Sequence, residues 1–409
     1  MELHELQLLE GLRAFLARDL ADCFLESEEA WQKLWNLCME QKVLPMVLDV
    51  LAPAAAKKDP PPAGLPMVRM HVLQSTAAQL QKTHAFLALY ETLRSHGLRP
   101  LVVKGILCRQ LYPKPDLRPS ADEDLLVSAD EMPAVLKILR EKGLTIEKED
   151  DEQVVSCRDA KTGLYLELHR SLFSQSSRAY GDLNGLFSQM FVRSVTVKVG
   201  ESVIHTLHPE DHFLYLILHS FKHFLHSGFG IRQVCDICLF AQTYSQDIDW
   251  ETVGQALETA RADIFGANLL EIGRRYLGFH SYPQQVQDWL ASQREWLDCE
   301  DLLADLLSGG IYGGNREERR HSSRITLNAA ANREESGKDH RLLRTIFPRK
   351  EELTSTYPYL DRHGWLLPAA WGQRILTYAR RGGGSVGAKE SIAIGERRVA
   401  LMKKYRVIR

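Results

Sequence analysis

The chain has 409 residues, of which 44% are hydrophobic and 25% charged, which is ordinary for a globular protein with room for two or three domains. Its formal net charge of −2 lacks the basic excess of general nucleic-acid binders, so we expect no such binding. Seven scattered cysteines, no basic and apolar leader, and no long apolar run predict a cytoplasmic protein without disulfides or a transmembrane segment.

The first 66 residues are predicted to form an N-terminal helical segment that ends in a proline-rich linker. Apolar residues at helical spacing favour two helices within residues 4–51. The stretch 52–66, APAAAKKDPPPAGLP, is too rich in proline for a helix. A long helix is expected over residues 67–96, and Gly97 is placed to be its left-handed C-terminal residue.

Residues 67–208 are predicted to form a small mixed sheet core. RPLVVK at 99–104 is typical of a buried strand that leads into a short helix, and a second strand is expected to end near Val127. Three further strands are expected between residues 144 and 169, and a hairpin between residues 195 and 207.

Helical patterns return after this core. Pro209 and the acidic residues behind it are a start signal for a helix, and helices are expected to fill a domain of residues 209–308. Residues 309–409 are predicted to form a mobile loop, charged over 316–340, plus an aromatic C-terminal region that packs on the core. The fold class predicted is therefore α+β, with a small mixed sheet and helical N-terminal and C-terminal regions.

Two aspartates, Asp122 and Asp124, are the first candidates for chemistry. Residues two apart on a strand face the same side, so the two carboxylates would lie together and call for a cation such as Mg²⁺. A bare D-x-D motif is more often an ordinary charged turn. In LYLELH, Glu167 and His169 share one face of a later strand, so Glu167 becomes a third carboxylate if the two strands are neighbours.

Basic groups surround these acids in the sequence. Lys104-Gly105 ends a strand at a helix start, where a phosphate can bind, and Arg118 precedes the aspartates. His219 and His223 are spaced to bind zinc, although substrate-facing or core histidines are favoured. Arg232 and Asp236 are interpreted as an ion pair within one helix, with a pocket wall as the alternative.

The order of these motifs resembles a known family. VVKGILCRQLYPKPDLRPSADEDLLV, followed by LYLELH and by HSFKHF and RQVCDI, is similar to the bacterial uncharacterised nucleotidyltransferases of the polymerase-beta-like superfamily. Two positions depart from the pattern. Lys104-Gly105 replaces the usual Gly-Ser turn, which removes a serine contact to phosphate. Glu123, between the aspartates, is more often apolar and needs an explanation on the other face of the strand.

The resemblance implies an enzyme that moves a nucleoside monophosphate from a nucleoside triphosphate to a hydroxyl-bearing acceptor and releases pyrophosphate. Two Mg²⁺ ions would bind the three carboxylates, and nucleotide-binding roles would fall to Lys104, Gly105, Arg118, His169, His219 and His223. A nucleotide- or partner-binding protein without turnover, and a phosphotransferase, are the alternatives. The base remains open, and so does the acceptor, which can be a small molecule or a protein side chain.

Overall fold

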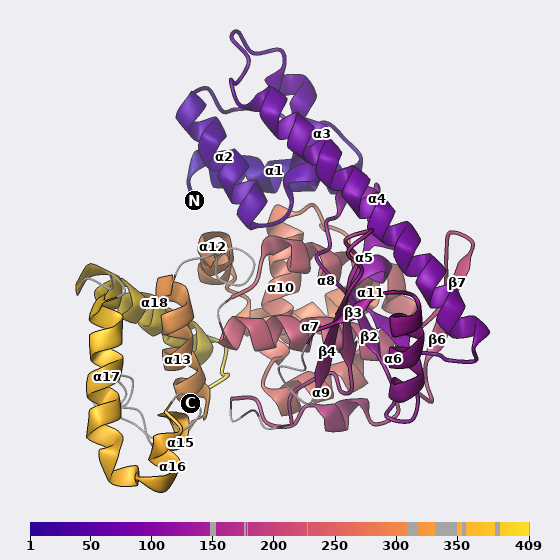
Figure 1. Cartoon of the computed structure of the whole chain (residues 1–409). Helices are drawn as coiled ribbons and strands as arrows, with labels where there is room; N and C mark the ends of the chain where they lie inside the picture. The colour runs from indigo at the N-terminus through magenta and orange to yellow at the C-terminus, as the bar shows by residue number, and fades with distance from the viewer. Residues whose placement is uncertain are drawn as a thin grey trace.

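A seven-stranded mixed sheet between helices forms the centre of the molecule (Figure 1). The computed structural model describes residues 1–147, 153–175, 177, 179–226, 228–309, 317–331, 350–353, 357–380 and 385–408. Helical regions precede and follow the sheet along the chain, which confirms the predicted α+β fold class.

The N-terminal segment contains three helices, where two were predicted. They are α1 (Leu3–Ala17), α2 (Glu28–Glu40) and α3 (Leu44–Ala55). The break between α2 and α3 is short and depends on Lys42, whose backbone φ is +54°, so helical periodicity alone did not separate them. Helix α3 also extends into the expected linker and contains Pro53 in its last turn, which costs the helix one backbone hydrogen bond.

Helix α4 (Leu65–Ser95) is the longest element before the sheet and runs from the N-terminal helices along the sheet (Figure 1). Gly97 follows it with φ +78°, as predicted for a left-handed C-terminal residue.

The sheet has the strand order β3-β4-β5-β2-β1-β7-β6. The strands are β1 (Leu101–Val103), β2 (Glu123–Leu126), β3 (Thr145–Ile146), β4 (Val154–Arg158), β5 (Tyr165–His169), β6 (Val195–Val199) and β7 (Ser202–Thr206). Strand β2 lies at the centre, antiparallel to β1 and parallel to β5. Although β3 and β4 come between β2 and β5 in the chain, β2 and β5 are direct neighbours.

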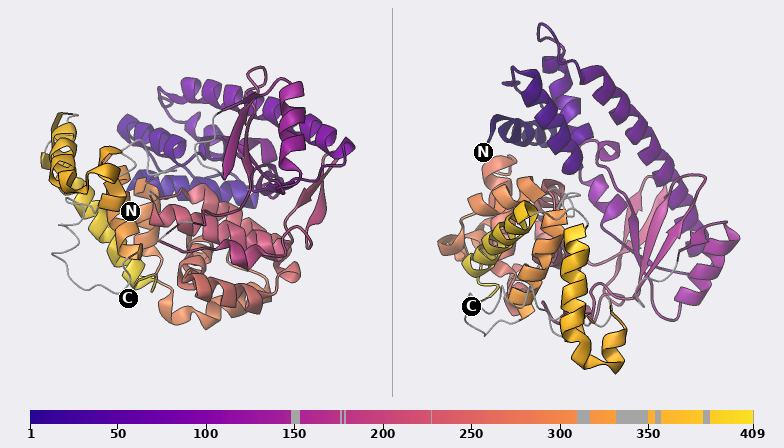
Figure 2. Two further views of the ribbon diagram at one scale, coloured as in Figure 1. Left: turned by 60° about the horizontal axis from the view of Figure 1, so that its bottom comes forward. Right: turned by 60° about the vertical axis from the view of Figure 1, so that its left-hand side comes forward.

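Two layers of helices cover the sheet, one on each face. Helices α4, α5 (Gly105–Gln110) and α6 (Met132–Glu141) share a core with Val102 and Leu125. Helices α7 (Pro209–Leu225) and α8 (Ile231–Tyr244) share another with Val103 and Leu126. Since neighbouring strand residues point to opposite faces, the α4 layer receives residue 123 and the α7 layer receives residue 124. Figure 2 gives two further views of these layers.

The rest of the described chain is helical. The helices are α9 (Trp250–Ala260), α10 (Asp263–Tyr276), α11 (Gln284–Ser292), α12 (Glu300–Gly309), α13 (Glu317–Ala331), α15 (Lys350–Leu353), α16 (Tyr359–Arg362), α17 (Leu367–Arg380) and α18 (Ser385–Lys404). Short 3₁₀ helices cover Pro115–Leu117, Asn184–Phe187, Ser245–Asp247, Arg294–Trp296 and Gly364–Leu366. None of the helices in the described ranges combines the length and apolarity needed to cross a membrane.

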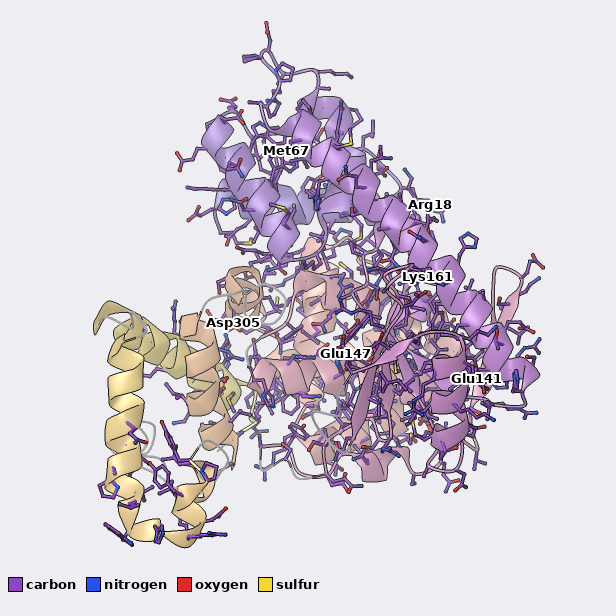
Figure 3. All side chains as sticks on the ribbon, in the orientation of Figure 1. Arg18, Met67, Glu141, Glu147, Lys161 and Asp305 are labelled. Atoms are coloured by element: carbon purple, nitrogen blue, oxygen red, sulfur yellow. The ribbon has the colours of Figure 1, made fainter. Side chains whose placement is uncertain are left out.

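The C-terminal helices α13 and α18 anchor the end of α7. The loop predicted over residues 316–340 is wrong for 317–331, which form α13, and the remainder lies outside the described residues. Helix α13 forms because it buries one face: the fully buried Thr326 hydroxyl donates to the Leu225 carbonyl at 2.7 Å. Buried Arg398 of α18 donates to the Phe224 carbonyl and lies 3.7 Å from Asp305, labelled in Figure 3.

Candidate active site

Strands β2 and β5 bring three of the predicted residues onto one face of the sheet. In their parallel register, Asp124 lies opposite Glu167, and Leu126 lies opposite His169. Residues opposite each other in a ladder project to the same side, and Leu126 belongs to the core shared with α7. The side chains of Asp124, Glu167 and His169 therefore face α7.

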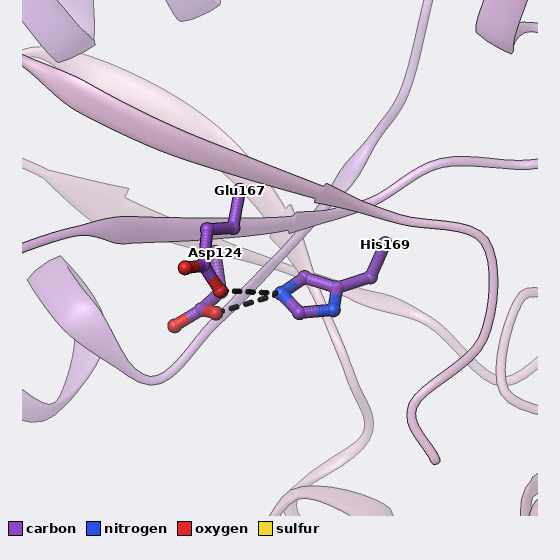
Figure 4. A group of neighbouring side chains, drawn as sticks. All are labelled: Asp124, Glu167 and His169. Atoms are coloured by element: carbon purple, nitrogen blue, oxygen red, sulfur yellow. Dashed lines mark hydrogen bonds and ion pairs between the residues drawn. The ribbon is translucent and has the colours of Figure 1, made fainter. Parts of the chain in front are cut away.

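Figure 4 shows the three side chains pointing toward one another. His169 Nε2 lies 2.8 Å from Asp124 Oδ1 and 3.5 Å from Glu167 Oε2. One ligand atom from each residue lies within 4.8 Å of the other two. Atoms on opposite sides of one ion stand about 4–5 Å apart, twice a metal–oxygen distance of about 2.0–2.6 Å. Two carboxylates and an imidazole at this separation therefore fit a divalent cation.

Charge in this group is balanced by neighbouring side chains. Burial acts to raise the pKa of Asp124, but the nearby Lys104 and the hydrogen bond to His169 outweigh it and hold that pKa well below its ordinary value. Burial acts to lower the pKa of His169, but its hydrogen bonds to Asp124 and Glu167 raise it overall. A metal ion that binds Asp124 must therefore compete with the Lys104 ammonium and the His169 imidazole, which already contact this carboxylate.

Asp122 lies just before β2, two residues ahead of Asp124. It is outside the group of three whose ligand atoms meet, but it lines a small cleft together with Lys104 and His219. Burial raises the pKa of Asp122, and the negative charges of Asp124 and Glu167 raise it further, against the opposing charge of Lys104. The carboxylate of Asp122 is thus close enough to the other two to be repelled by them.

Lys104 is held in place by a strained turn and by α7. Its φ is +55°, an uncommon value for a residue with a side chain. Its N–H donates to Nε2 of buried His212 at 3.1 Å, and burial, aided by the positive charge of Lys104, lowers the pKa of His212 to about 3. A neutral imidazole can accept that bond. The ammonium of Lys104 lies 3.0 Å from Asp124 Oδ2, 3.1 Å from His219 Nε2 and 5.7 Å from the centre of the Tyr215 ring.

Glu123 has a structural explanation on the opposite face. It is 3% exposed, and one carboxylate oxygen binds Arg109 at 2.6 Å. The other accepts the Ile106 N–H, at the start of α5, at 2.8 Å. A β-carbon on Gly105, where φ is +37°, would lie 2.0 Å from that oxygen. The turn after β1 therefore requires glycine, and the amide of the second helical residue, Ile106, is already bound by the protein itself.

Arg118 is also occupied. Its Nε and Nη2 donate to the two carboxylate oxygens of Asp236 at 2.7 and 2.5 Å, and its Nη1 lies 3.5 Å from the Gly105 carbonyl. The predicted pair of Arg232 with Asp236 is wrong, because Arg118 reaches Asp236 from the loop before β2. Tyr112 donates a further bond to the same carboxylate at 2.7 Å. Arg118 and Arg232 both line the cleft beside Asp122.

His219 and His223 meet each other rather than the carboxylates. Their Nε2 atoms are 3.2 Å apart. In the described part of the chain, neither belongs to the group that can hold a metal, so the zinc alternative receives no support. The prediction that both bind the nucleotide stays a prediction.

Sequence reasoning missed three residues of α7 that surround these histidines: His212, Tyr215 and Lys222. They precede or follow His219 by seven, four and three positions, which places all of them on one side of a helix. This spacing was the available signal. It was hidden because most of α7 is buried and apolar, so its polar positions did not stand out as a face.

Comparison with known proteins gives one match. The model of a family described as "Uncharacterised nucleotidyltransferase" matches residues 27–278, more than half of the chain. The matched stretch begins at α2, ends just after α10 and contains all seven strands and the α7 face. No curated protein and no solved structure matches the chain.

Proposed function

Because this chain belongs to the family of uncharacterised nucleotidyltransferases, we propose that it is a Mg²⁺-dependent enzyme that transfers a nucleoside monophosphate. The donor is a nucleoside triphosphate, the acceptor carries a hydroxyl group, and pyrophosphate is released. The family supplies the reaction class. The metal, the nucleotide and the acceptor belong to the proposal.

One observation supports the proposal above the others: the register of β2 on β5. It sets Asp124 directly opposite Glu167, and Asp122, just before β2, lines the same cleft as Asp124. Lys104 offsets one of these three negative charges, and a bound metal cation would offset the others. Carboxylates beside a cleft that also holds Lys104 and Arg232 suit metal-assisted transfer from a triphosphate.

We assign Asp122, Asp124 and Glu167 as the residues that hold two Mg²⁺ ions, with His169 beside them. Bound there, Mg²⁺ would supply Lewis-acid stabilisation of negative charge on phosphate oxygens. The donor chemistry fits, since Mg²⁺ prefers carboxylate oxygens and keeps several of its waters. The imidazole of His169 orients Asp124 through their 2.8 Å contact.

Different residues of the chain then have different roles in the transfer. The acceptor oxygen attacks the α-phosphorus, and its proton passes to a base. Glu167 suits that role, because its side chain is 30% exposed whereas that of Asp124 is 4% exposed. As the new bond forms, the bond from the α-phosphorus to the bridging oxygen breaks and pyrophosphate leaves. Lys104 offsets the charge that develops on the departing phosphates.

Arg118 contributes to nucleotide binding by its position. Its guanidinium is bound to Asp236, so we assign it to holding the cleft wall and the Gly105 carbonyl beside the phosphates. Gly105 contributes by allowing the chain to turn sharply after β1.

The experiment is pyrophosphate release from each of the four nucleoside triphosphates with Mg²⁺ and a cell extract, with mass spectrometry to find the adduct. Loss of a residue that only supports a metal ligand typically costs about 10–100-fold, so Asp122→Asn and Asp124→Asn should each lower the rate at least about a hundredfold. Asp288→Asn, on the exposed side of α11, is the matched control and should leave the rate unchanged.

The same experiment separates the alternatives. A phosphotransferase releases nucleoside diphosphate in place of pyrophosphate. A binding protein without turnover binds nucleotide and forms neither product. If Asp124→Asn releases pyrophosphate as fast as the wild type, the assigned site is wrong.

A further inference from the structure

One backbone donor at the start of α5, where the sequence predicted a phosphate cradle, is already used by the protein itself. The Ile106 N–H is bound by Glu123 at 2.8 Å, on the face of the sheet away from the candidate site. Helix α5 is also only six residues long, so its dipole adds little. Side-chain donors are therefore needed to hold a triphosphate near Asp124.

Helix α7 supplies a row of basic side chains beside Asp124. His219, Lys222 and His223 are partly exposed on a helix whose other residues near them are buried. The spacing of three and four residues places all three on one side of α7. We call these three residues the α7 basic stripe.

The contacts within the stripe join basic groups to one another. Lys104 Nζ lies 3.1 Å from His219 Nε2, which lies 3.2 Å from His223 Nε2. A single imidazole nitrogen carries either one proton or one lone pair, so it cannot serve two donors at once. The ammonium of Lys222 has no hydrogen-bond or ion-pair partner among the residues that the structure describes.

The pKa values of the stripe residues also reflect crowding among basic groups. Burial lowers the pKa of His219, of Lys222 and, to about 3, of His223, and the positive charge of Lys104 lowers each further. Asp124 and Glu167 are the acidic groups that counteract this for Lys222. An anion between these side chains would offset the positive charge of Lys104 and give the ammonium of Lys222 an acceptor.

We propose that the α7 basic stripe, together with Lys104, binds the β- and γ-phosphates of the nucleotide. This rests on the proposed function. The position of Lys104 favours the terminal phosphates over an acceptor group: its ammonium bridges Asp124 Oδ2 at 3.0 Å and His219 at 3.1 Å. An anion bound by the stripe would therefore lie beside Lys104, which itself contacts the assigned metal ligand Asp124. The metal-bound end of a triphosphate must lie equally close to the metal ligands.

Tripolyphosphate is the probe, because it carries the charges of the nucleotide tail without the base. Its affinity is measured by calorimetry on the full chain, without metal and in the presence of a chelator. Lys222→Gln and His223→Gln should each weaken binding about tenfold, the value of one hydrogen bond to a charged group. Lys137→Gln is the matched control, since Lys137 is 76% exposed on α6, and its affinity should equal that of the wild type.

Two further readouts separate a phosphate-binding role from a structural one. Thermal melting should be within a few degrees of the wild type for both variants, and Mn²⁺ binding to the carboxylates should be unchanged. Adenosine triphosphate should compete with tripolyphosphate, whereas adenosine monophosphate should not. If both stripe variants bind tripolyphosphate with wild-type affinity, the inference is overturned.

Failure of this inference and failure of the proposed function give different results. If transfer depends on Asp124 while the stripe variants keep their tripolyphosphate affinity, the function stands and the stripe assignment is wrong. If stripe variants lose tripolyphosphate but no nucleotide is ever transferred, the anion site stands and the function is wrong. If inorganic phosphate binds as tightly as tripolyphosphate and adenosine triphosphate does not compete, the stripe holds a single phosphate of an acceptor, which overturns the β,γ assignment.

Discussion

Replacing Glu123 by glutamine tests the buried ion pair that fixes the turn behind the candidate site. Glu123 and Arg109 are 3% and 1% exposed, and their charged atoms lie 2.6 Å apart. Glutamine keeps the shape but leaves the Arg109 charge buried without a partner. Removal of one member of a buried pair costs about 3–5 kcal/mol, so the variant should lose about that much of a total unfolding free energy of about 5–15 kcal/mol.

The assay is urea unfolding followed by the fluorescence of the seven tryptophans. The midpoint should fall while the slope with denaturant stays constant, which marks a change in stability alone. Glu141→Gln is the matched control. Glu141 lies on α6, is labelled in Figure 3 and is 60% exposed, with Lys137 3.9 Å away, so its loss should cost under about 0.5 kcal/mol.

A double-mutant cycle shows whether the cost comes from the pair itself. Arg109→Met leaves the Glu123 carboxylate uncompensated, whereas Arg109→Met combined with Glu123→Gln leaves no buried charge. The double variant should therefore be more stable than the sum of the single losses predicts, by about 2 kcal/mol. A loss below about 1 kcal/mol for Glu123→Gln, or strictly additive losses in the cycle, would refute the reasoning.

Three further predictions concern the same region. Gly105→Ala sets a β-carbon 2.0 Å from a Glu123 oxygen and should lower the melting temperature by several degrees; an unchanged calorimetric transition would contradict it. Lys104→Met removes the cation 3.0 Å from Asp124 and should tighten Mn²⁺ binding to nucleotide-free protein about tenfold in a spin-resonance titration, whereas weaker binding would mean that the ammonium does not compete. Buried His212 has a folded-state pKa of about 3, against an ordinary value of 6.5, so protonation of the unfolded chain lowers the stability of the wild type as pH falls below 6.5. Between pH 8 and pH 5 the unfolding free energy of the wild type should fall by about 2 kcal/mol more than that of His212→Gln. Parallel pH profiles of the two proteins would count against this.

Local patterns were sufficient to predict most elements of the core. The alternation of leucines with Glu167 and His169 gave the correct faces of β5, because a strand repeats every two residues. Asp122 lies just before β2, so the same rule does not place its side chain. Gly97 marked the end of α4 for an equally local reason, since a glycine adopts positive φ at little cost.

Contacts between distant elements were beyond the reach of those patterns. The pairing of β2 with β5 skips over two intervening strands, so the approach of Glu167 to Asp124 was stated only as a condition. The charge on Glu123 is explained by Arg109 of α5, which forms a buried ion pair with it. The ion pair of Arg118 with Asp236 was not predicted, because no spacing rule connects residues so far apart in the chain.

The central claim is that Asp124 and Glu167 hold the metal at a nucleotide-binding site next to Lys104. Anomalous diffraction from crystals grown with Mn²⁺ and a non-hydrolysable nucleoside triphosphate tests it most directly. We expect an anomalous peak about 2.0–2.6 Å from carboxylate oxygens of both residues, with the triphosphate against Lys104 and α7. A peak at other residues, or ordered nucleotide elsewhere with no metal between these two carboxylates, would contradict it.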